Sequence, residues 1–97
     1  MAAYVVSIAR VDDWSENFQK YADQAADLTD KLGAEYVIRG EPVANVEGEI
    51  FNDRVMVISK WPSVEAAQSY WNSKEYQEIK PLRDNTGIYD VAIFEEA

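Results

Sequence analysis

The sequence predicts an α+β fold, a ferredoxin-like βαββαβ sandwich whose four-stranded antiparallel sheet has its helices on one face. The first observation is the element order, strand–helix–strand twice over, because two right-handed βαβ units interleave as such a sheet. The second is the length, since 97 residues make one domain with a modest core. The third is that the predicted strands are apolar on both faces, although no helix is left for the second face. We therefore expect a single domain over residues 1–97 that forms a homodimer, a dimeric α+β barrel.

The first strand is predicted over residues 4–11, where β-branched and aromatic residues are concentrated ahead of two aspartates. Alternation divides its apolar residues between two faces, with Tyr4, Val6 and Ile8 opposed to Val5, Ala9 and Val11. A strand that is apolar on both faces is expected to be covered on both sides.

A helix is predicted over residues 13–32 from a continuous apolar stripe. The stripe consists of Trp14, Phe18, Tyr21, Ala25, Leu28 and Leu32. Asp13 is the expected N-cap, because Glu16 follows it at the spacing of a capping box, and Gly33 is expected to end the helix. The stripe is expected to face the core, and Tyr21 is the member whose hydroxyl would reach a cavity.

The second strand is predicted over residues 34–40, where alternation places Arg39 on the face opposite Tyr36 and Ile38. A guanidinium among apolar neighbours needs a partner. Two interpretations stay open: Arg39 lies on a sheet edge and pairs with a glutamate, or it lines a cleft and binds a ligand carboxylate. Residues 42–53 are expected to add a short edge strand or hairpin with turns at Gly48 and Asn52.

The second half repeats the order of the first. A third strand is predicted over residues 54–61, and Pro62 ends it. Ser63 is the expected N-cap of a helix over residues 64–72, and Ser73 that of a short helix over residues 74–80. Pro81 is expected to end or kink that helix, because it lacks an N–H and clashes with the preceding turn. A loop over residues 83–87 and a last strand over residues 88–95 complete the prediction.

Composition excludes several classes of function. The formal charge of −9 repels phosphate backbones and anionic lipid, so neither nucleic acid nor a membrane is an expected partner. The absence of cysteine and histidine removes thiolate nucleophiles, the commonest general base and the commonest metal ligands, so we expect no metal and no cofactor. No signal peptide and no apolar run long enough to span a membrane is present, and a cytoplasmic location is expected.

The second half carries recognisable motifs. The segment AEYVIRG at residues 34–40 is followed by VEG at 46–48 and by a long run over residues 54–83 that contains WNSKEYQ and ends in Arg83. This pattern resembles the family called domain of unknown function 1330, and the resemblance covers nearly the whole chain. The family is similar to dimeric α+β barrel proteins, so the resemblance implies the fold already reached from the element order. It implies a small protein of unsettled activity.

The resemblance also implies recurrent polar positions, which are Arg39, Glu47, Ser73, Glu75, Tyr76 and Arg83. The chain departs from the family pattern in three places. Trp61 stands where Phe is commoner, Lys74 replaces a proline, and Glu41 replaces the second glycine of an RGG motif. Glu41 places an acid near Arg39 and could neutralise it.

A ligand-binding cleft is predicted between the sheet and the helices, with Arg39 and Arg83 converging at its open end. The ligand-binding candidates are Arg39, Tyr76, Arg83, Trp71, Tyr21, Glu47 and Ser73. Aromatic walls with two guanidinium groups suit an anionic or carbonyl-bearing organic molecule. The alternative is that the aromatics are core residues and Arg83 caps carbonyls or pairs with Asp84. Ser73 fits an N-cap better than a nucleophile, because no histidine is present to activate it.

Three functions remain open at this stage. The first is a small-molecule-binding barrel. The second is a non-catalytic dimeric module with a filled interior. The third, implied by related barrels, is a cofactor-independent enzyme with monooxygenase-like or isomerase-like chemistry, for which Glu47, Glu75 and Asp84 are the candidate bases if buried. Fold alone does not decide among them.

Overall fold

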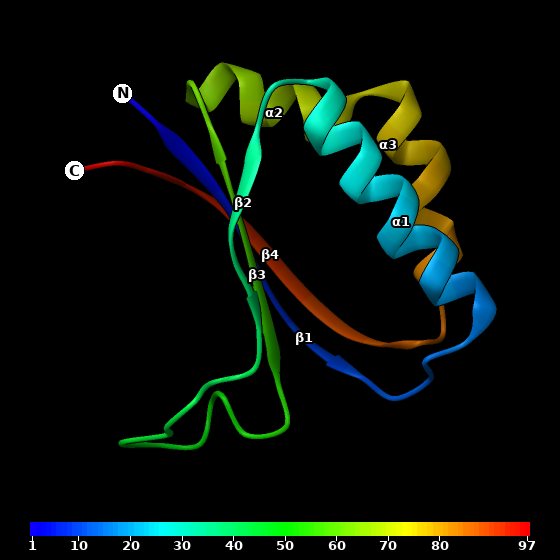
Figure 1. Cartoon of the computed structure of the whole chain (residues 1–97), viewed down its shortest axis with the longest axis vertical. Helices are drawn as coiled ribbons and strands as arrows, with labels where there is room; N and C mark the ends of the chain where they lie inside the picture. The colour runs from blue at the N-terminus through cyan, green and yellow to red at the C-terminus, as the bar shows by residue number, and fades with distance from the viewer.

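A four-stranded antiparallel sheet forms one layer of the computed structural model, which describes all 97 residues (Figure 1). Three α-helices and one 3-10 helix form the other layer. In chain order the elements are β1 Ala3–Val11, α1 Glu16–Lys31, β2 Glu35–Gly40, β3 Val55–Trp61, α2 Val64–Asn72, α3 Lys74–Ile79, the 3-10 helix η1 Lys80–Arg83 and β4 Gly87–Glu95.

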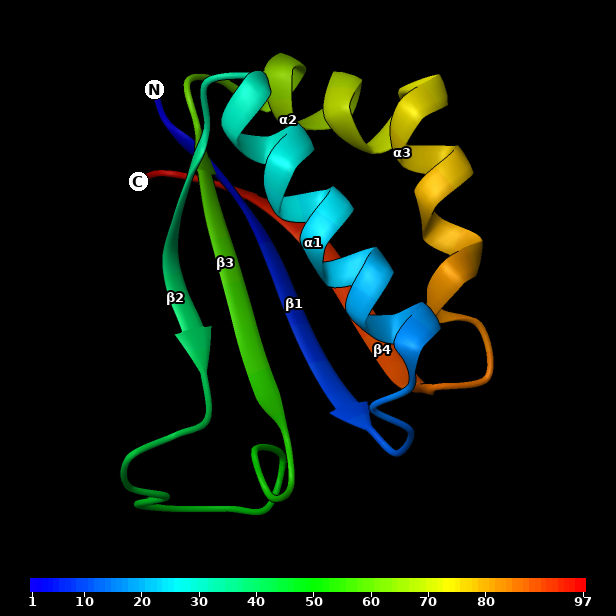
Figure 2. The same cartoon turned by 45° about the vertical axis from the view of Figure 1, so that its right-hand side comes forward.

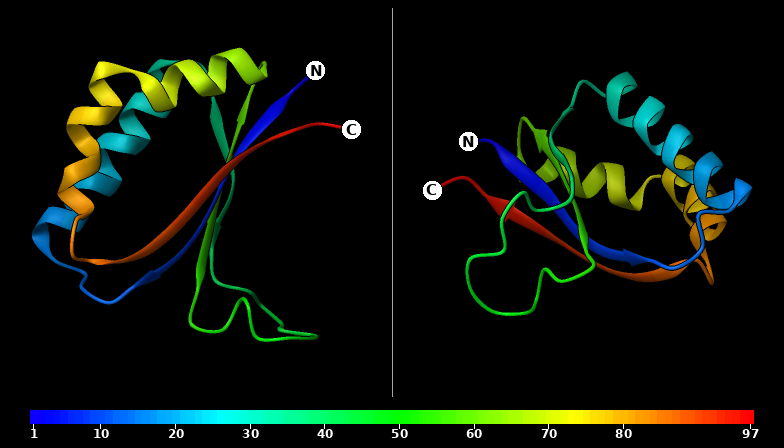
Figure 3. Two further views of the ribbon diagram at one scale, coloured as in Figure 1. Left: turned by 180° about the vertical axis from the view of Figure 1, so that it is seen from behind. Right: turned by 60° about the horizontal axis from the view of Figure 1, so that its bottom comes forward.

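The strand order is β2-β3-β1-β4, and every neighbouring pair is antiparallel. Helices α1, α2 and α3 all lie on one side of the sheet (Figure 2). This arrangement confirms the predicted ferredoxin-like α+β fold. It also leaves one sheet face without a helix, as the views from behind and below make clear (Figure 3).

Helix α1 begins later than predicted. Ser15, not Asp13, is the N-cap, and its hydroxyl accepts a hydrogen bond from the Phe18 N–H at 3.3 Å. The prediction of Asp13 was wrong: its backbone N–H donates to the Thr86 carbonyl at 3.0 Å, 73 residues away in the chain (86 − 13), and the residue lies in the connection that precedes the helix. Trp14 therefore precedes the helix and is 66% exposed, so it does not extend the buried stripe.

Strand β2 does not alternate regularly. Its register against β3 shifts between Tyr36 and Ile38, as in a β-bulge, where one extra residue reverses the faces beyond it. Tyr36 and Arg39 consequently face the same side, that of the helices, whereas Ile38 faces the other. The predicted opposition of Arg39 to Tyr36 was wrong for this reason. The predicted edge strand or hairpin over residues 42–53 is also absent, because the segment is an irregular loop with turns.

The core between the two layers is mainly aromatic. Trp61 and Tyr76 are its largest fully buried side chains, at 2% and 1% exposure. Ring centroids lie 4.6 Å apart for Trp61 and Tyr70, 4.8 Å for Tyr70 and Tyr76, and 4.9 Å for Tyr76 and Trp71. The Trp61 indole N–H donates to the Ser59 hydroxyl at 2.9 Å, so its polar atom is satisfied. This aromatic row holds α2 and α3 against β3.

The sheet face without helices is also apolar. Ile38, Ile88 and Phe94 are 48%, 48% and 56% exposed on the strands that form it. The β1 residues Val6 and Ile8 pair with residues of β3 and β4 on this face. A sheet that buries only one side normally shows polar residues on the other. The face therefore carries more apolar side chains than a solvated sheet face, although Arg10, Lys60 and Asp90 also lie on it.

Gly87 occupies a position that only glycine fits. It pairs with Val11 at the end of the β1–β4 ladder, and a Cβ built on it would stand 2.0 Å from the Arg10 carbonyl oxygen. That oxygen belongs to the backbone and has no rotamer to relieve the overlap. The strand must therefore shift if any side chain is added.

We expect Gly87→Ala to lower the free energy of unfolding by at least about 2 kcal/mol, because overpacking against backbone displaces the strand. Urea denaturation followed by circular dichroism measures the change. Ser69→Ala, on the exposed surface of α2, is the control and should change stability by no more than about 0.5 kcal/mol. A Gly87→Ala protein as stable as the wild type would contradict the close β1–β4 pairing at this end.

Candidate functional site

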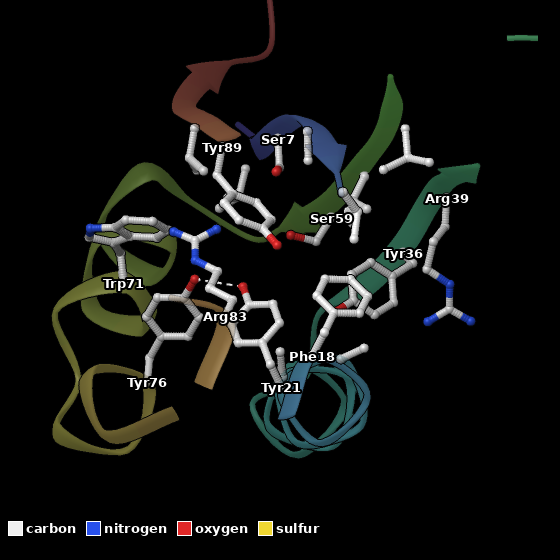
Figure 4. Close-up of a pocket in the computed structure, with 18 of the residues that line it drawn as sticks. Ser7, Phe18, Tyr21, Tyr36, Arg39, Ser59, Trp71, Tyr76, Arg83 and Tyr89 are labelled. Carbon is white, nitrogen blue, oxygen red and sulfur yellow. Dashed lines mark hydrogen bonds between the residues drawn. The ribbon is translucent and has the colours of Figure 1, made fainter. Parts of the chain in front are cut away.

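A cavity of about 130 Å³ lies between the sheet and the helices. Fifteen of its 19 lining residues are hydrophobic, and every helix and strand contributes at least one of the 19. The lining residues drawn in Figure 4 include Ser7, Phe18, Tyr21, Tyr36, Arg39, Ser59, Trp71, Tyr76, Arg83 and Tyr89. A largely apolar cavity with a few convergent polar groups has the form of a small-molecule site.

Small side chains leave the space. Ser7 and Ala9 on β1 and Ser59 on β3 face the helices from the middle of the sheet. Valines and two strand tyrosines, Tyr36 and Tyr89, line most of the remaining floor. Phe18 and Tyr21 of α1 close the space from the opposite layer. The three short side chains of the sheet do not reach the large side chains of α1, and the space between the two layers stays open.

Arg83 is the charged group inside the site, and its backbone is held from three directions. It ends the 3-10 helix η1, where Pro81 lies in the first turn. Its carbonyl accepts hydrogen bonds from both the N–H and the hydroxyl of Thr86. The Thr86 carbonyl in turn accepts from the N–H groups of Asp12 and Asp13 at 2.7 and 3.0 Å. The segment carrying Arg83 is thereby tied to the connection between β1 and α1.

The Arg83 guanidinium is buried without a protein counterion. The residue is 7% exposed, and its guanidinium carbon lies 4.4 Å from the Tyr89 ring centroid and 5.4 Å from that of Tyr21. The three ion pairs of the chain involve other residues, and no protein acceptor bonds the guanidinium. In particular, the pairing with Asp84 considered from the sequence is not formed. No fully buried side-chain nitrogen or oxygen lacks a partner, so these nitrogens open onto the cavity.

Two tyrosine hydroxyls meet beside Arg83. The hydroxyl oxygens of Tyr21 and Tyr76 are 2.8 Å apart and form a hydrogen bond (Figure 4). Burial raises the pKa of both hydroxyls, and for Tyr76 the neighbouring Tyr21 adds to the rise. Both are therefore neutral at ordinary pH. Either hydroxyl can be the donor in this pair, and the one that accepts keeps its own proton for another acceptor.

Tyr89 supplies the surface on which the guanidinium stacks. Its hydroxyl forms a hydrogen bond with the Thr86 hydroxyl, and that hydroxyl donates its only proton to the Arg83 carbonyl. Tyr89 must then be the donor in that pair. The ring is fixed at both ends, by its strand and by Thr86, and holds the guanidinium by a cation–π contact.

The structure brings five of the predicted residues to one cavity. They are Arg39, Tyr21, Trp71, Tyr76 and Arg83. The two arginines do not converge, however, which corrects one part of the prediction. The Arg39 guanidinium lies 4.9 Å from the centroid of the Tyr36 ring, is exposed, and points away from the cavity on the side opposite Arg83 (Figure 4). Its place at the rim follows from the bulge in β2, which turns it to the helix side at the open edge of the sheet.

Two predicted residues lie elsewhere. The Ser73 hydroxyl accepts from the Tyr76 N–H at 3.1 Å and donates to the Tyr70 carbonyl at 2.7 Å, so it caps α3 and closes α2. Glu47 is exposed in the loop between β2 and β3, and neither residue lines the cavity. The family positions therefore do not all lie in the cavity.

Sequence reasoning missed several lining residues, above all Tyr89, Tyr36, Ser7 and Ser59. A signal was present for the serines: each interrupts an apolar strand at a position whose face is otherwise buried. The signal for Tyr36 was hidden by the bulge. Nothing local marked Tyr89 as different from any other strand tyrosine.

Titratable chemistry inside the cavity is limited to tyrosine and arginine. None of the lining residues is an aspartate, glutamate or lysine. The chain gathers no group of three or more carboxylates that would hold a metal ion. No helix has the length and apolarity needed to cross a membrane. The chemistry the arrangement supports is hydrogen bonding and charge pairing with an anion.

Solved structures of other proteins share this fold of a four-stranded antiparallel sheet with its helices on one face. This protein is similar over 99% of its length to RPA0582, a protein of unknown function from Rhodopseudomonas palustris, with 17% identity, a TM-score of 0.73 and 82% of that chain covered. It is similar to SnoaB, a cofactor-independent oxygenase from Streptomyces nogalater, with 9% identity, a TM-score of 0.70, and 99% and 93% of the two chains covered. The de novo designed protein Foldit4 matches with 16% identity, a TM-score of 0.63 and full coverage of both chains. Identities this low establish the fold alone.

The family is established by sequence. Residues 2–97 match the model described as domain of unknown function (DUF1330), and the chain belongs to this family. A comparison with curated proteins finds no match. The resemblance seen in the WNSKEYQ run is thus confirmed over the whole domain, while the activity must be argued from the cavity.

We expect stability to fall at alkaline pH, because burial raises the pKa of Tyr21, Tyr70 and Tyr76 above the ordinary value of 10.0. Above that value the unfolded tyrosines ionise while the buried ones keep their protons, so the unfolded state gains stability. Each such group removes up to about 1.4 kcal/mol per pH unit. Urea denaturation between about pH 8 and about pH 11 measures the slope.

Tyr70→Phe provides the matched variant, because Tyr70 lies outside the Tyr21–Tyr76 pair. Its unfolding free energy should decline less steeply with pH than that of the wild type. Equal slopes in the two proteins would show that Tyr70 ionises alike in the folded and unfolded states.

Proposed function

We propose that the cavity binds a small organic anion, with Arg83 as its counterion. The single observation that carries the proposal is a guanidinium at 7% residue exposure that has no protein acceptor and opens onto an apolar space. A buried charge is costly unless it is paired and hydrogen-bonded. A ligand carboxylate supplies both the charge and the acceptor atoms, and it matches the fork of guanidinium donors.

The neighbouring groups support the same ligand. The Tyr21–Tyr76 pair keeps one hydroxyl proton for a ligand. With Tyr76 as the donor in the pair, that proton is on Tyr21 beside Arg83, and one carboxylate can accept from both. Lys80 lies over the Trp71 ring at 5.0 Å, and Arg39 stands at the rim. Three of the nine basic residues thus surround the site in a chain of net charge −9. The local field favours an anion although the protein as a whole repels it.

The size of the cavity limits the ligand to about one ring. A cavity of about 150 Å³ accommodates benzene in an engineered protein, and this one measures about 130 Å³. Valine and aromatic walls suit an apolar body of that size. The ligand class that fits is a single-ring or short branched carboxylic acid.

Binding without catalysis is better supported than the alternatives. A purely structural module would need no cavity with an unpaired charge. An enzyme resembling a cofactor-independent oxygenase is favoured by the fold shared with SnoaB. The cavity, however, has no carboxylate, and its buried tyrosines have raised pKa values, so no side chain there is suited to act as a base near neutral pH.

We also propose that the protein is a homodimer joined through the sheet face that has no helices. The support is the exposed apolar set on that face, including Ile38, Ile88 and Phe94. A second copy would bury both faces by one two-fold operation, as in dimeric α+β barrels. The cavity lies on the other side of the sheet, so dimerisation and ligand binding use different faces.

For ligand binding, we expect benzoate to bind the wild type and benzamide to bind at least about tenfold more weakly, since only the acid pairs with Arg83. Isothermal titration calorimetry measures both. Arg83→Met should abolish detectable benzoate binding. Arg54→Met removes the same charge in the β2–β3 loop, away from the cavity, and should leave the affinity within about twofold.

Equal affinity for benzoate and benzamide, or benzoate binding that survives in Arg83→Met, would contradict the role of Arg83 as counterion. Circular dichroism melts of both variants establish that loss of binding is not loss of fold.

For the dimer, we expect light scattering coupled to size-exclusion chromatography to give twice the chain mass. Phe94→Asp should shift the protein toward the monomer, because a charge is then desolvated in an apolar interface. Gln24→Asp adds the same charge on the exposed surface of α1 and should leave the mass unchanged. A stable wild-type monomer would rule the interface out.

A further inference from the structure

A second polar position lies on the sheet side of the cavity, opposite the layer that carries Arg83 and Tyr21. Ser7 of β1 and Ser59 of β3 line the cavity, and Figure 4 shows both hydroxyls directed into it (Figure 4). Ser7 pairs with Val57 and Ser59 with Val5, so the two serines are diagonal neighbours on one sheet face. They form one polar patch in an otherwise apolar floor.

Both hydroxyls have hydrogen-bonding capacity that the protein does not use. Ser59 accepts from the Trp61 indole N–H, and its own proton has no acceptor within the chain. Ser7 makes no side-chain hydrogen bond at all, and it is only half-buried. A hydroxyl inside an apolar cavity is unfavourable unless a partner reaches it. The position next to Ser7 therefore suits a ligand atom that can accept and donate.

The polar groups of the cavity thus come from both of its layers. Arg83, Tyr21 and Tyr76 belong to the helix layer, whereas the two serines belong to the sheet. The side chains flanking the serines on the floor are valines and Ala9, with the Tyr36 ring opposite Ser59. A molecule spanning the gap needs an anionic end, an apolar body and a neutral polar end.

Resting on the anion-binding function proposed above, we propose that the ligand is a ring-hydroxylated aromatic acid of the hydroxybenzoate class. Its carboxylate pairs with Arg83 and accepts from Tyr21, and its ring hydroxyl exchanges hydrogen bonds with Ser7 and Ser59. The serines then determine specificity, since they distinguish a hydroxy acid from the parent acid without touching the charge.

Calorimetric titration of the wild type with benzoate, 3-hydroxybenzoate and 4-hydroxybenzoate tests the inference. At least one hydroxybenzoate is expected to bind about 3- to 10-fold more tightly than benzoate, the gain that one neutral hydrogen bond supplies. In Ser7→Ala that gain should fall below about twofold while benzoate affinity stays within about twofold of the wild type. Ser69→Ala, an exposed hydroxyl on α2, is the matched control and should keep the full preference.

Ser59→Ala is the second variant. Because this substitution removes the acceptor of the Trp61 indole N–H, a thermal melt must first show that the variant is folded. The serine subsite is overturned if benzoate binds the wild type but no hydroxybenzoate binds more tightly. It is also overturned if the preference for a hydroxybenzoate persists in Ser7→Ala and in a folded Ser59→Ala. In both cases anion binding by Arg83 stands. If neither benzoate nor the hydroxybenzoates bind the wild type, both proposals fail together. Loss of the preference in either serine variant, with benzoate binding intact, supports the inference.

Discussion

The hydrogen bonds of Thr86 connect the parts of this structure on which the site depends. At 3% exposure, this residue accepts from Asp12 and Asp13 through its carbonyl and donates its hydroxyl proton to the carbonyl of Arg83. It thereby joins the end of the helix layer to the start of α1 and to the first residues of β4. The place of Arg83 and the course of the β1–α1 connection both depend on this junction. Because its partners lie far apart in the chain, the junction forms only when the two halves dock.

The electrostatics of the cavity run against those of the whole chain. An acidic protein keeps its carboxylates on the surface and places one guanidinium between tyrosine rings in its interior. Cation–π contacts offset part of the cost of burying that charge, but they supply no acceptor for its N–H groups. The pairing left open inside the cavity is the basis of the proposed binding site. The family resemblance points to residues along one segment and therefore describes the cavity lining only in part.

The two faces of the sheet carry different side chains. The helix side carries the cavity and its polar groups, while the other side presents aliphatic and aromatic residues with no cover of their own. Successive side chains along a strand point alternately to the two faces of the sheet. One extra residue in a strand therefore moves the following side chains to the opposite face. The bulge in β2 is such a case, because it moves Arg39 to the helix side and Ile38 to the other.

The sequence by itself determined the order and nearly all the bounds of the helices and strands, the capping roles of Ser63 and Ser73, and the candidacy of Tyr76 and Arg83. These features depend on periodicity, capping and turn chemistry within a few residues, which the chain displays directly. Only the tertiary structure decided that Ser15 starts α1, that Arg39 and Arg83 stand apart, and that Tyr89 and the two serines join the site. Each of these depends on contacts between residues distant in the chain, or on a register shift that alternation does not reveal.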